Sequence, residues 1–221
     1  MARKYKLVLF DLDGTLLDTL DDLSEAVNQA LTKRDFPTHT RDEYMTMVGH
    51  GVRNLVMQAL PAEKQGDEGL VDEALADFKA YYTAHIDVYT HPYPGMQELL
   101  QTLDKEGVFL AVVSNKFQEG AEYLVNKLFP GTRFVAVLGN KPGCPLKPDP
   151  EIVAQVLKKT GLQPHEAILV GDSPTDMKTA ANGGIQSIAV SWGYRPMKGI
   201  QGLTVVDSAE ELYKNLADET K

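Results

Sequence analysis

The stretch LVLFDLDGTLLD, residues 7–18, decides the fold. Its apolar start, Leu7 to Phe10, predicts a buried strand, and Asp11 and Asp13 follow that strand directly. Side chains at positions i and i+2 of an extended chain project to the same side, so two like charges would meet in one site. A cation would relieve their repulsion, and this favours a chemical site. The alternative is a strand-to-turn junction in which Asp, Gly and Thr supply only turn geometry.

The segment that follows, residues 19–89, carries apolar residues at helical spacing. The first stripe consists of Leu20, Leu23, Val27, Ala30 and Leu31. We predict helices from this stripe to Pro37 and over residues 41–47, 52–60 and 68–86, with no strand among them. This part of the chain is expected to form a small all-helical bundle.

After Pro94-Gly95 the pattern alternates between helix and strand. Predicted helices cover residues 95–106, 117–128, 151–160, 175–182 and 209–216. Predicted strands cover residues 108–113, 134–138, 167–170, 186–190 and 204–206, in addition to residues 6–10. Strands that alternate with helices indicate an α/β fold whose parallel sheet has helices on both faces. The first strand stands apart from the others, so the helical bundle, residues 18–90, is inserted into an α/β core formed by residues 1–17 and 91–221.

The composition is that of an ordinary globular protein, with 221 residues, 43% hydrophobic and 24% charged. A net charge of -9 argues against nucleic acid as a partner, because binding to a phosphate backbone needs a basic face. No stretch approaches the roughly 20 apolar residues of a membrane span. The single cysteine, Cys144, excludes an internal disulfide, and we expect a reducing, cytoplasmic location.

Polar side chains gather where the predicted strands end. They are Asp11, Asp13, Ser114, Asn115, Lys116, Asp172 and Asp176, with Lys147 in a loop that can reach the same edge. Ligands of open α/β sheets bind outside the carboxyl ends of the strands. The acids could hold a divalent cation, and the lysine and serine could hold an anion beside it. Alone, Ser114 could cap a helix, and Asp176 could be an ordinary acid in the first turn of one.

Four short motifs carry a resemblance to a known family. DLDGTLLDT, VVSNK, KPDP and GDSPTD, in this order, resemble the haloacid dehalogenase-like hydrolase superfamily. The resemblance implies a Rossmann-like sheet with an inserted helical cap, and a Mg²⁺-dependent phosphatase that acts through an aspartyl-phosphate. It implies Asp11 as nucleophile, Asp13 as general acid/base and Lys147 as the neutralising cation. The implied metal-site residues are Asp11, Asp13, Asp172 and Asp176, and Ser114 and Asn115 are the implied phosphate-binding residues.

The cap should select the substrate. VGHGVRNLV, residues 48–56, resembles the glycine-flanked specificity loop of phosphoglycolate phosphatases, as do residues 81–95 and the SWGYR stretch, 191–195. The likeness places Gly49, His50, Gly51 and Arg53 at the active site, where Arg53 or His50 could pair with a substrate carboxylate. The alternative is that Arg53 is an ordinary helix-surface arginine. Trp192 and Tyr194 could either edge the pocket or pack.

The expected partner is therefore a small phosphorylated metabolite, with phosphoglycolate first among the candidates. Alternatives are a sugar-phosphate phosphomutase, a pyrophosphatase, a nucleotidase or a non-catalytic metabolite-binding relative. The protein is expected to be a monomer or a small homo-oligomer. Residues 17–19 and 90–95 are candidate hinges for a moving cap.

Overall fold

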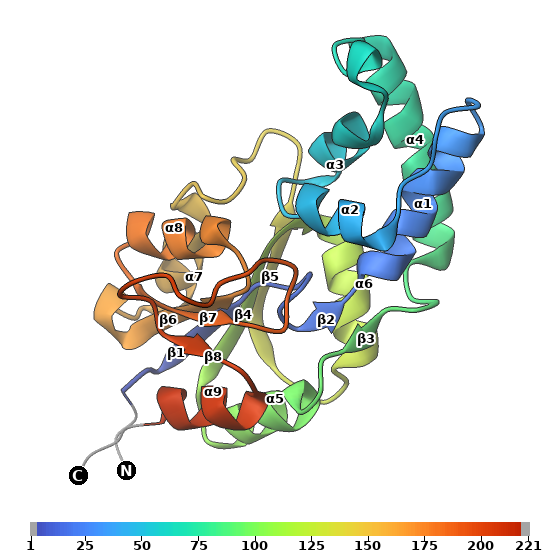
Figure 1. The fold of residues 1–221 in the computed structure, drawn as a ribbon. Coiled ribbons are helices and arrows are strands. Elements are labelled where there is room, and N and C mark those ends of the chain that lie inside the picture. Colours follow the sequence, from blue (N-terminus) through green and yellow to red (C-terminus); the bar gives the residue numbers. More distant parts are fainter. Residues whose placement is uncertain (1–3, 218–221) are drawn as a thin grey trace.

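A six-stranded parallel sheet forms the centre of the molecule (Figure 1). The structure is a computed structural model and describes residues 4–217. In the order in which they lie side by side, the strands are β5 (Phe134–Asn140), β4 (Phe109–Phe117), β1 (Leu7–Phe10), β6 (Ala167–Gly171), β7 (Gln186–Val190) and β8 (Val205–Val206). The first strand of the chain thus lies inside the sheet, with a parallel neighbour on each side.

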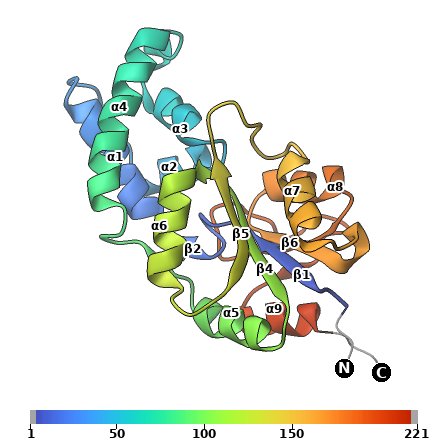
Figure 2. The same cartoon turned by 180° about the vertical axis from the view of Figure 1, so that it is seen from behind.

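Helices cover both faces of this sheet, as the alternation predicts (Figure 2). One face carries α5 (Met96–Lys105), α6 (Gln118–Leu128) and α9 (Ala209–Leu216), and the other carries α7 (Glu151–Thr160) and α8 (Pro174–Asn182). Strand β1 serves both layers, because Val8 and Phe10 pack into one apolar cluster and Leu7 and Leu9 into the other. A strand buried on both faces reads as a continuous apolar run.

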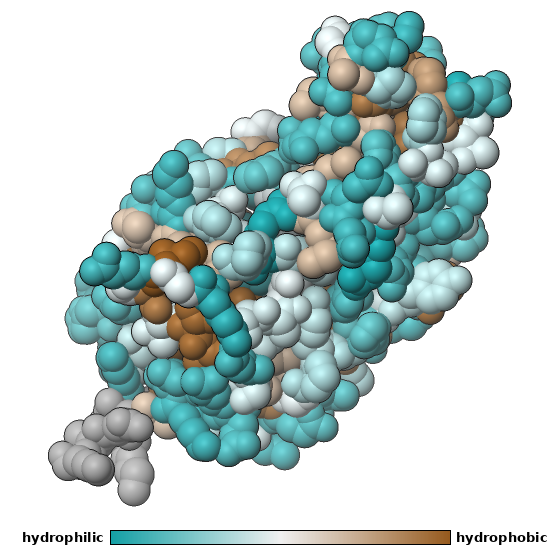
Figure 3. All heavy atoms as spheres, in the orientation of Figure 1, coloured by the Kyte–Doolittle hydropathy of each residue, from teal (hydrophilic) through white to brown (hydrophobic). Residues whose placement is uncertain are grey.

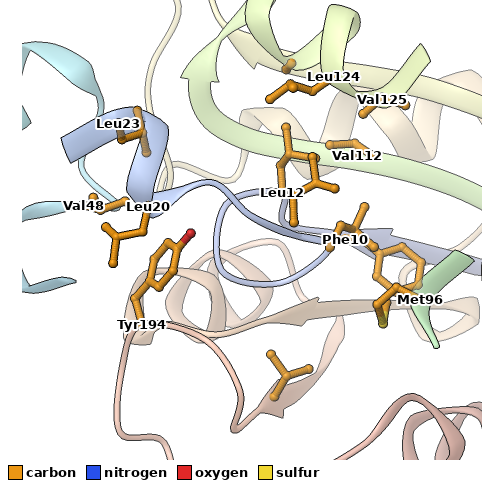
Figure 4. Close-up of a cluster of buried hydrophobic side chains, with 14 of the residues drawn as sticks. Phe10, Leu12, Leu20, Leu23, Val48, Met96, Val112, Leu124, Val125 and Tyr194 are labelled. Atoms are coloured by element: carbon orange, nitrogen blue, oxygen red, sulfur yellow. The ribbon is translucent and has the colours of Figure 1, made fainter. Parts of the chain in front are cut away.

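The inserted segment folds as four helices that stand beside the carboxyl ends of the strands (Figure 1). They are α1 (Leu20–Thr32), α2 (Arg41–Met47), α3 (Val52–Ala59) and α4 (Glu68–His85). The whole predicted stripe of α1 is buried, and it packs mainly against α4. Leu20 and Leu23 continue the core cluster toward Tyr194 of the α/β layer (Figure 4). The cap is therefore seated on the core through apolar contacts.

Two chain crossings join the cap to the core. They pair as a short antiparallel ribbon of β2 (Leu17–Asp18) and β3 (His91–Pro92), in which Leu17 faces Pro92 and Asp18 faces His91. The sequence pattern did not predict this ribbon, because two-residue strands have no periodicity. Both crossings occur at residues 17/18 and 90/91, where the sequence predicts the boundaries between cap and core. The assignment of residues 18–90 to a separate domain stays a sequence-based prediction.

The ends of some elements differ from the predicted ones. Strand β4 continues to Phe117, so Ser114, Asn115 and Lys116 lie in the strand and not after it. Helix α1 ends at Thr32, before Pro37. The face seen in Figure 3 is mainly hydrophilic, with smaller hydrophobic patches. Within residues 4–217, no helix is both long and apolar enough to cross a bilayer.

Candidate active site

The polar residues predicted from the strand ends meet at the carboxyl edge of the sheet. Strand β1 lies between β4 and β6, so the segments that follow or end these three strands are spatial neighbours. Asp11 follows β1, Ser114 lies near the end of β4, and Asp172 follows β6. This confirms the expected parallel-sheet arrangement that places the site.

A buried lysine joins two carboxylates at the centre of this site. Lys147 Nζ lies 2.8 Å from Asp11 Oδ1 and 2.6 Å from Asp176 Oδ1, and only 1% of the lysine side chain is exposed. Burial alone would lower the pKa of Lys147, but the charges of Asp11 and Asp176 raise it above its usual range. The lysine therefore stays a cation between two acids.

Asn115 holds the loop that carries this lysine. Its Oδ1 accepts a hydrogen bond from Lys147 N at 2.8 Å, and its Nδ2 donates to Lys147 O at 3.1 Å. The same Nδ2 donates to Gly49 O of the cap at 3.0 Å. The Asn115 amide thus contacts the lysine loop and the cap together.

Three carboxylates form a cluster suited to a metal ion. Asp11, Asp172 and Asp176 each offer an oxygen, and these atoms lie within 4.8 Å of one another. Burial, followed by the charge of Asp176, raises the pKa of Asp11 to about 7 and that of Asp172 to about 8. A divalent cation would reverse this effect, since hard cations prefer carboxylate oxygens and favour their charged form. The donor set therefore fits a divalent metal.

The backbone of two loops packs closely around Asp172. Tyr194 N donates to Asp172 Oδ2 at 2.8 Å. A Cβ on Gly193 would lie 2.2 Å from Asp172 Cβ, and a Cβ on Gly14, whose φ is +85°, would lie 2.5 Å from Asp172 Oδ2. Both positions need glycine because two loops approach the carboxylate too closely for any side chain.

Asp176 has two structural partners as well as its place in the cluster. It stands in the first turn of α8, where its Oδ2 accepts from Ser173 N at 3.1 Å and Ser173 Oγ at 2.6 Å. The first-turn position that the sequence offered as an alternative is therefore observed, together with the contact to Lys147.

Asp13 lies apart from the metal cluster. Its Oδ1 accepts from Thr19 Oγ1 at 2.7 Å and from Lys116 Nζ at 3.0 Å. Lys116 is as deeply buried as Lys147, and it also donates to Tyr82 Oη of the cap helix α4 at 2.7 Å. Two acids that are two residues apart thus have different lysines as partners.

Ser114 is buried in β4, and its Oγ accepts from Lys116 N at 3.3 Å. It caps no helix, because the residue at the N-terminal boundary of α6 is Phe117.

A cavity of about 40 Å³ lies between the core and the cap. Its core wall consists of Asp11, Asp13, Ser114, Asn115 and Lys116, and its cap wall of Leu23, Val48, Gly49, Gly51, Val52 and Leu55. The core wall is polar and charged, whereas the cap wall is apolar or backbone. All charged side chains of the cavity wall therefore lie on the core side.

The predicted cap residues reach different places. Gly49 and Gly51 line the cavity, whereas His50 is exposed and is not among the lining residues. Arg53 pairs with Glu68 and, at 3.2 Å, with Asp72 on α4, and 44% of its side chain is exposed. In this closed arrangement Arg53 is therefore turned toward the cap surface.

The SWGYR segment, residues 191–195, contacts both the loop after β1 and the cap. Trp192 Nε1 donates to Thr15 O at 3.1 Å, and Tyr194 Oη accepts from Thr19 N at 2.8 Å. Arg195 donates to the carbonyl oxygens of Thr46 and Val48 in the cap, both at 2.8 Å. The sequence allowed Trp192 and Tyr194 either to edge the pocket or to pack. The structure shows packing against the loop after β1, and neither residue lines the cavity.

Several working parts of the site were not predicted from the sequence. Thr19 ends the first motif and Lys116 ends the second, but neither was assigned as a partner of Asp13. Tyr82, the partner of Lys116, lies in the cap stretch 81–95, where no role was assigned to it. Arg195 and Gly193 were visible only as parts of the SWGYR segment.

The three-carboxylate cluster, which could hold a cation, and the buried lysines beside Asp11 and Asp13 suit chemistry on an anionic group. Residues 8–190 match the model of a family described as haloacid dehalogenase-like hydrolase, and the chain belongs to this family. Curated relatives named phosphoglycolate phosphatase are 32% identical in Mesorhizobium japonicum (96% of this chain, 95% of the relative) and 31% identical in Mannheimia succiniciproducens (100% and 99%). A solved structure of a candidate phosphoglycolate phosphatase from Lactobacillus delbrueckii subsp. bulgaricus is 34% identical, with a TM-score of 0.90, over 98% of this chain and 100% of that one.

Proposed function

We propose that the protein is a Mg²⁺-dependent phosphatase that hydrolyses small phosphomonoesters through an aspartyl-phosphate, with phosphoglycolate as substrate. The observation that carries this proposal is the pairing of Lys147 with Asp11 beside the Asp172–Asp176 cluster, while Asp13 stays separate. The full-length likeness to phosphoglycolate phosphatases supports the substrate.

Asp11 is the proposed nucleophile. Its Oδ1 accepts from Leu12 N at 2.7 Å and contacts Lys147 Nζ, whereas no hydrogen bond reaches Oδ2 from residues 4–217. Attack by Oδ2 on phosphorus would form the acyl phosphate and break the ester P–O bond. Lys147 offsets the repulsion between the carboxylate and the phosphoryl group, and Ser114 on the same wall can donate to a phosphoryl oxygen.

Asp13 is the proposed general acid and base. It would give its proton to the departing alkoxide oxygen and would then take a proton from the water that attacks the acyl phosphate. The second step releases inorganic phosphate and restores the Asp11 carboxylate. Thr19 and Lys116 hold Asp13 in place through hydrogen bonds to one of its oxygens, Oδ1.

Asp11, Asp172 and Asp176 would hold the metal. Bound Mg²⁺ would supply positive charge that screens the phosphoryl oxygens from the surrounding carboxylates. Mg²⁺ keeps several water ligands, so a site with three protein carboxylates is sufficient. Asp13 was also predicted as a metal-site residue, but its carboxylate is not in this cluster.

The cavity favours a small substrate. The cap supplies Leu23, Val48, Val52 and Leu55 to its wall, so bulky groups on the cap side would meet aliphatic side chains. We propose that the cap, residues 18–90, opens at the two crossings to admit substrate and closes to exclude water. The nucleoside of a nucleotide or the ring of a large sugar phosphate would meet this apolar wall, and this disfavours those alternatives.

We further propose a cytoplasmic enzyme, supported by the single Cys144, which excludes an internal disulfide. A monomer or small homo-oligomer remains the sequence-based prediction.

The test is release of inorganic phosphate from a panel of phosphoglycolate, sugar phosphates, nucleoside monophosphates and pyrophosphate, with Mg²⁺ and with a chelator. We expect turnover to be fastest on phosphoglycolate and to disappear with the chelator. Loss of activity on every compound would refute the phosphatase and favour a metabolite-binding relative. An isomerised sugar phosphate without free phosphate would identify a phosphomutase.

The first variant is Asp11→Asn, which removes the nucleophile and keeps the side-chain shape. Its turnover should fall to background, whereas Asp207→Asn, the same change at an exposed acid 58% accessible to solvent, should keep full activity. Activity retained in Asp11→Asn would exclude Asp11 as nucleophile.

A further inference from the structure

Lys116 is the basic residue of the substrate cavity. Of the described residues that line this cavity, it alone carries a positive charge. Lys147 lies behind Asp11, and Arg53 is paired with Glu68 and Asp72 on the cap surface. A negatively charged group on the leaving part of a substrate therefore has one cation within the cavity to meet.

The ammonium of Lys116 has a donor to spare. A protonated lysine carries three N–H groups. Two of them are directed to Asp13 Oδ1 at 3.0 Å and Tyr82 Oη at 2.7 Å, which are the hydrogen bonds that Lys116 Nζ makes among residues 4–217. The third N–H is available to a group that enters the cavity.

The other lining groups give an acidic substituent little support. On the cap side the cavity meets aliphatic side chains and glycine backbone, and on the core side it meets Asp11 and Asp13. Of the two neutral polar residues of the core wall, Ser114 is assigned to the phosphoryl group, and the amide of Asn115 already donates to Gly49 O and Lys147 O. A carboxylate enclosed there without a cation would lose its hydration and be repelled by both acids. The third donor of Lys116 offsets both effects.

We propose that Lys116 recognises the carboxylate of the substrate, so that the enzyme selects phosphomonoesters with a carboxylate one methylene group away from the ester oxygen. This inference rests on the proposed function. Lys116 is bound to Asp13, the acid assigned to the leaving oxygen, so its ammonium lies beside the leaving group. In phosphoglycolate a single methylene separates that oxygen from the carboxylate.

Tyr82 makes this recognition depend on the closed cap. It belongs to α4, is fully buried and stacks on Phe78, with ring centroids 5.2 Å apart. Its hydroxyl group fixes Lys116 only while the cap is seated on the core. Lys116 would thus meet the substrate carboxylate in its final position only after closure.

The test compares two substrates of equal length, phosphoglycolate and ethyl phosphate, which has a methyl group in place of the carboxylate. Wild-type enzyme with Mg²⁺ should prefer phosphoglycolate in kcat/KM. Lys116→Met should reduce this preference about 10- to 100-fold, the range of one charge-assisted hydrogen bond. Any displacement of Asp13 slows both substrates alike and cancels in the ratio.

Two further variants control this experiment. Arg53→Met removes the competing cation of the cap loop, and the preference should survive it. Tyr82→Phe keeps the ring and removes the hydroxyl group. The preference for phosphoglycolate should therefore fall by a smaller factor than in Lys116→Met. The variant should also raise KM for phosphoglycolate more than KM for ethyl phosphate. If Lys116→Met does not fold, Tyr82→Phe still tests the proposal.

Each outcome has one meaning. The inference is overturned if Lys116→Met keeps the preference for phosphoglycolate, or if Tyr82→Phe affects the two substrates equally. Either result leaves the proposed phosphatase function unaffected. Loss of preference in Arg53→Met assigns the recognition to the cap loop instead. A wild-type enzyme that hydrolyses other phosphomonoesters but not phosphoglycolate overturns the proposed substrate, and this inference with it.

Discussion

Replacement of Lys147 by methionine tests the buried charges at the centre of the site. The substitution keeps most of the side-chain volume and removes the ammonium that lies 2.8 Å from Asp11 and 2.6 Å from Asp176. Breaking a buried pair by removing one partner leaves an uncompensated charge and costs about 3–5 kcal/mol. We expect the free energy of unfolding of the metal-free protein at pH 8 to fall by this amount, a large share of a typical total of about 5–15 kcal/mol.

Urea unfolding, followed by the fluorescence of the single tryptophan, measures this loss. Trp192 is bonded to Thr15 of the first loop, so it reports on the site itself. The matched control is Lys6→Met, which breaks a 2.7 Å pair with Glu166 at the surface, where 62% of the lysine is exposed. A surface pair contributes at most about 1 kcal/mol, so the control should change little.

The size of the loss should also depend on pH. Near pH 5 the neighbouring carboxyl groups can take up protons, and the deficit of Lys147→Met should shrink because fewer unpaired charges remain. A deficit equal to that of Lys6→Met, or one that does not change between pH 5 and pH 8, would show that Lys147 does not compensate these acids.

Metal binding and the seating of the cap can each be measured. The raised pKa values of Asp11 and Asp172, about 7 and about 8, mean that the folded state holds protons which the unfolded state has lost. Stability without metal should therefore fall as pH rises from about 4 to about 8, and Mg²⁺ should add more to the melting temperature at pH 8 than at pH 5. A pH-independent Mg²⁺ effect in thermal unfolding would contradict this. Arg195→Met removes two hydrogen bonds to the Thr46 and Val48 carbonyls and should raise KM about tenfold in steady-state assays, with little change in kcat, because the closed cap becomes less favourable. An unchanged KM would show that these bonds do not hold the cap.

The α/β core and its acids could be predicted because they depend on local patterns. Asp11 and Asp172 follow continuous apolar runs, and parallel strands bring such positions to a common edge whatever the details of packing. The three-carboxylate cluster follows largely from that topology, and the loop that carries Lys147 reaches the same edge, where the lysine contacts Asp11.

The contacts between cap and core could not be predicted in the same way. Whether Arg53 turns to the cavity or to Glu68 depends on how α3 packs on α4, and the spacing of residues within one helix does not determine that angle. The contact of Lys116 with Tyr82 depends likewise on how the whole cap is seated. Short β2 and β3 arise from tertiary pairing and leave no periodic signal.

The position of β1 in the sheet has a consequence for the synthesis of the protein. Leu7 pairs with Phe109 on one side and with Ala167 on the other, so β1 is synthesised about a hundred residues before one partner strand and still longer before the other. The cap helices find most of their contacts within their own segment and can fold while the strand waits. A nascent chain that stops before Ala167 leaves one edge of β1 uncovered and lacks Asp172. The catalytic centre is thus among the last parts of the molecule to be assembled, and a truncated product would have a folded cap without a site to cover.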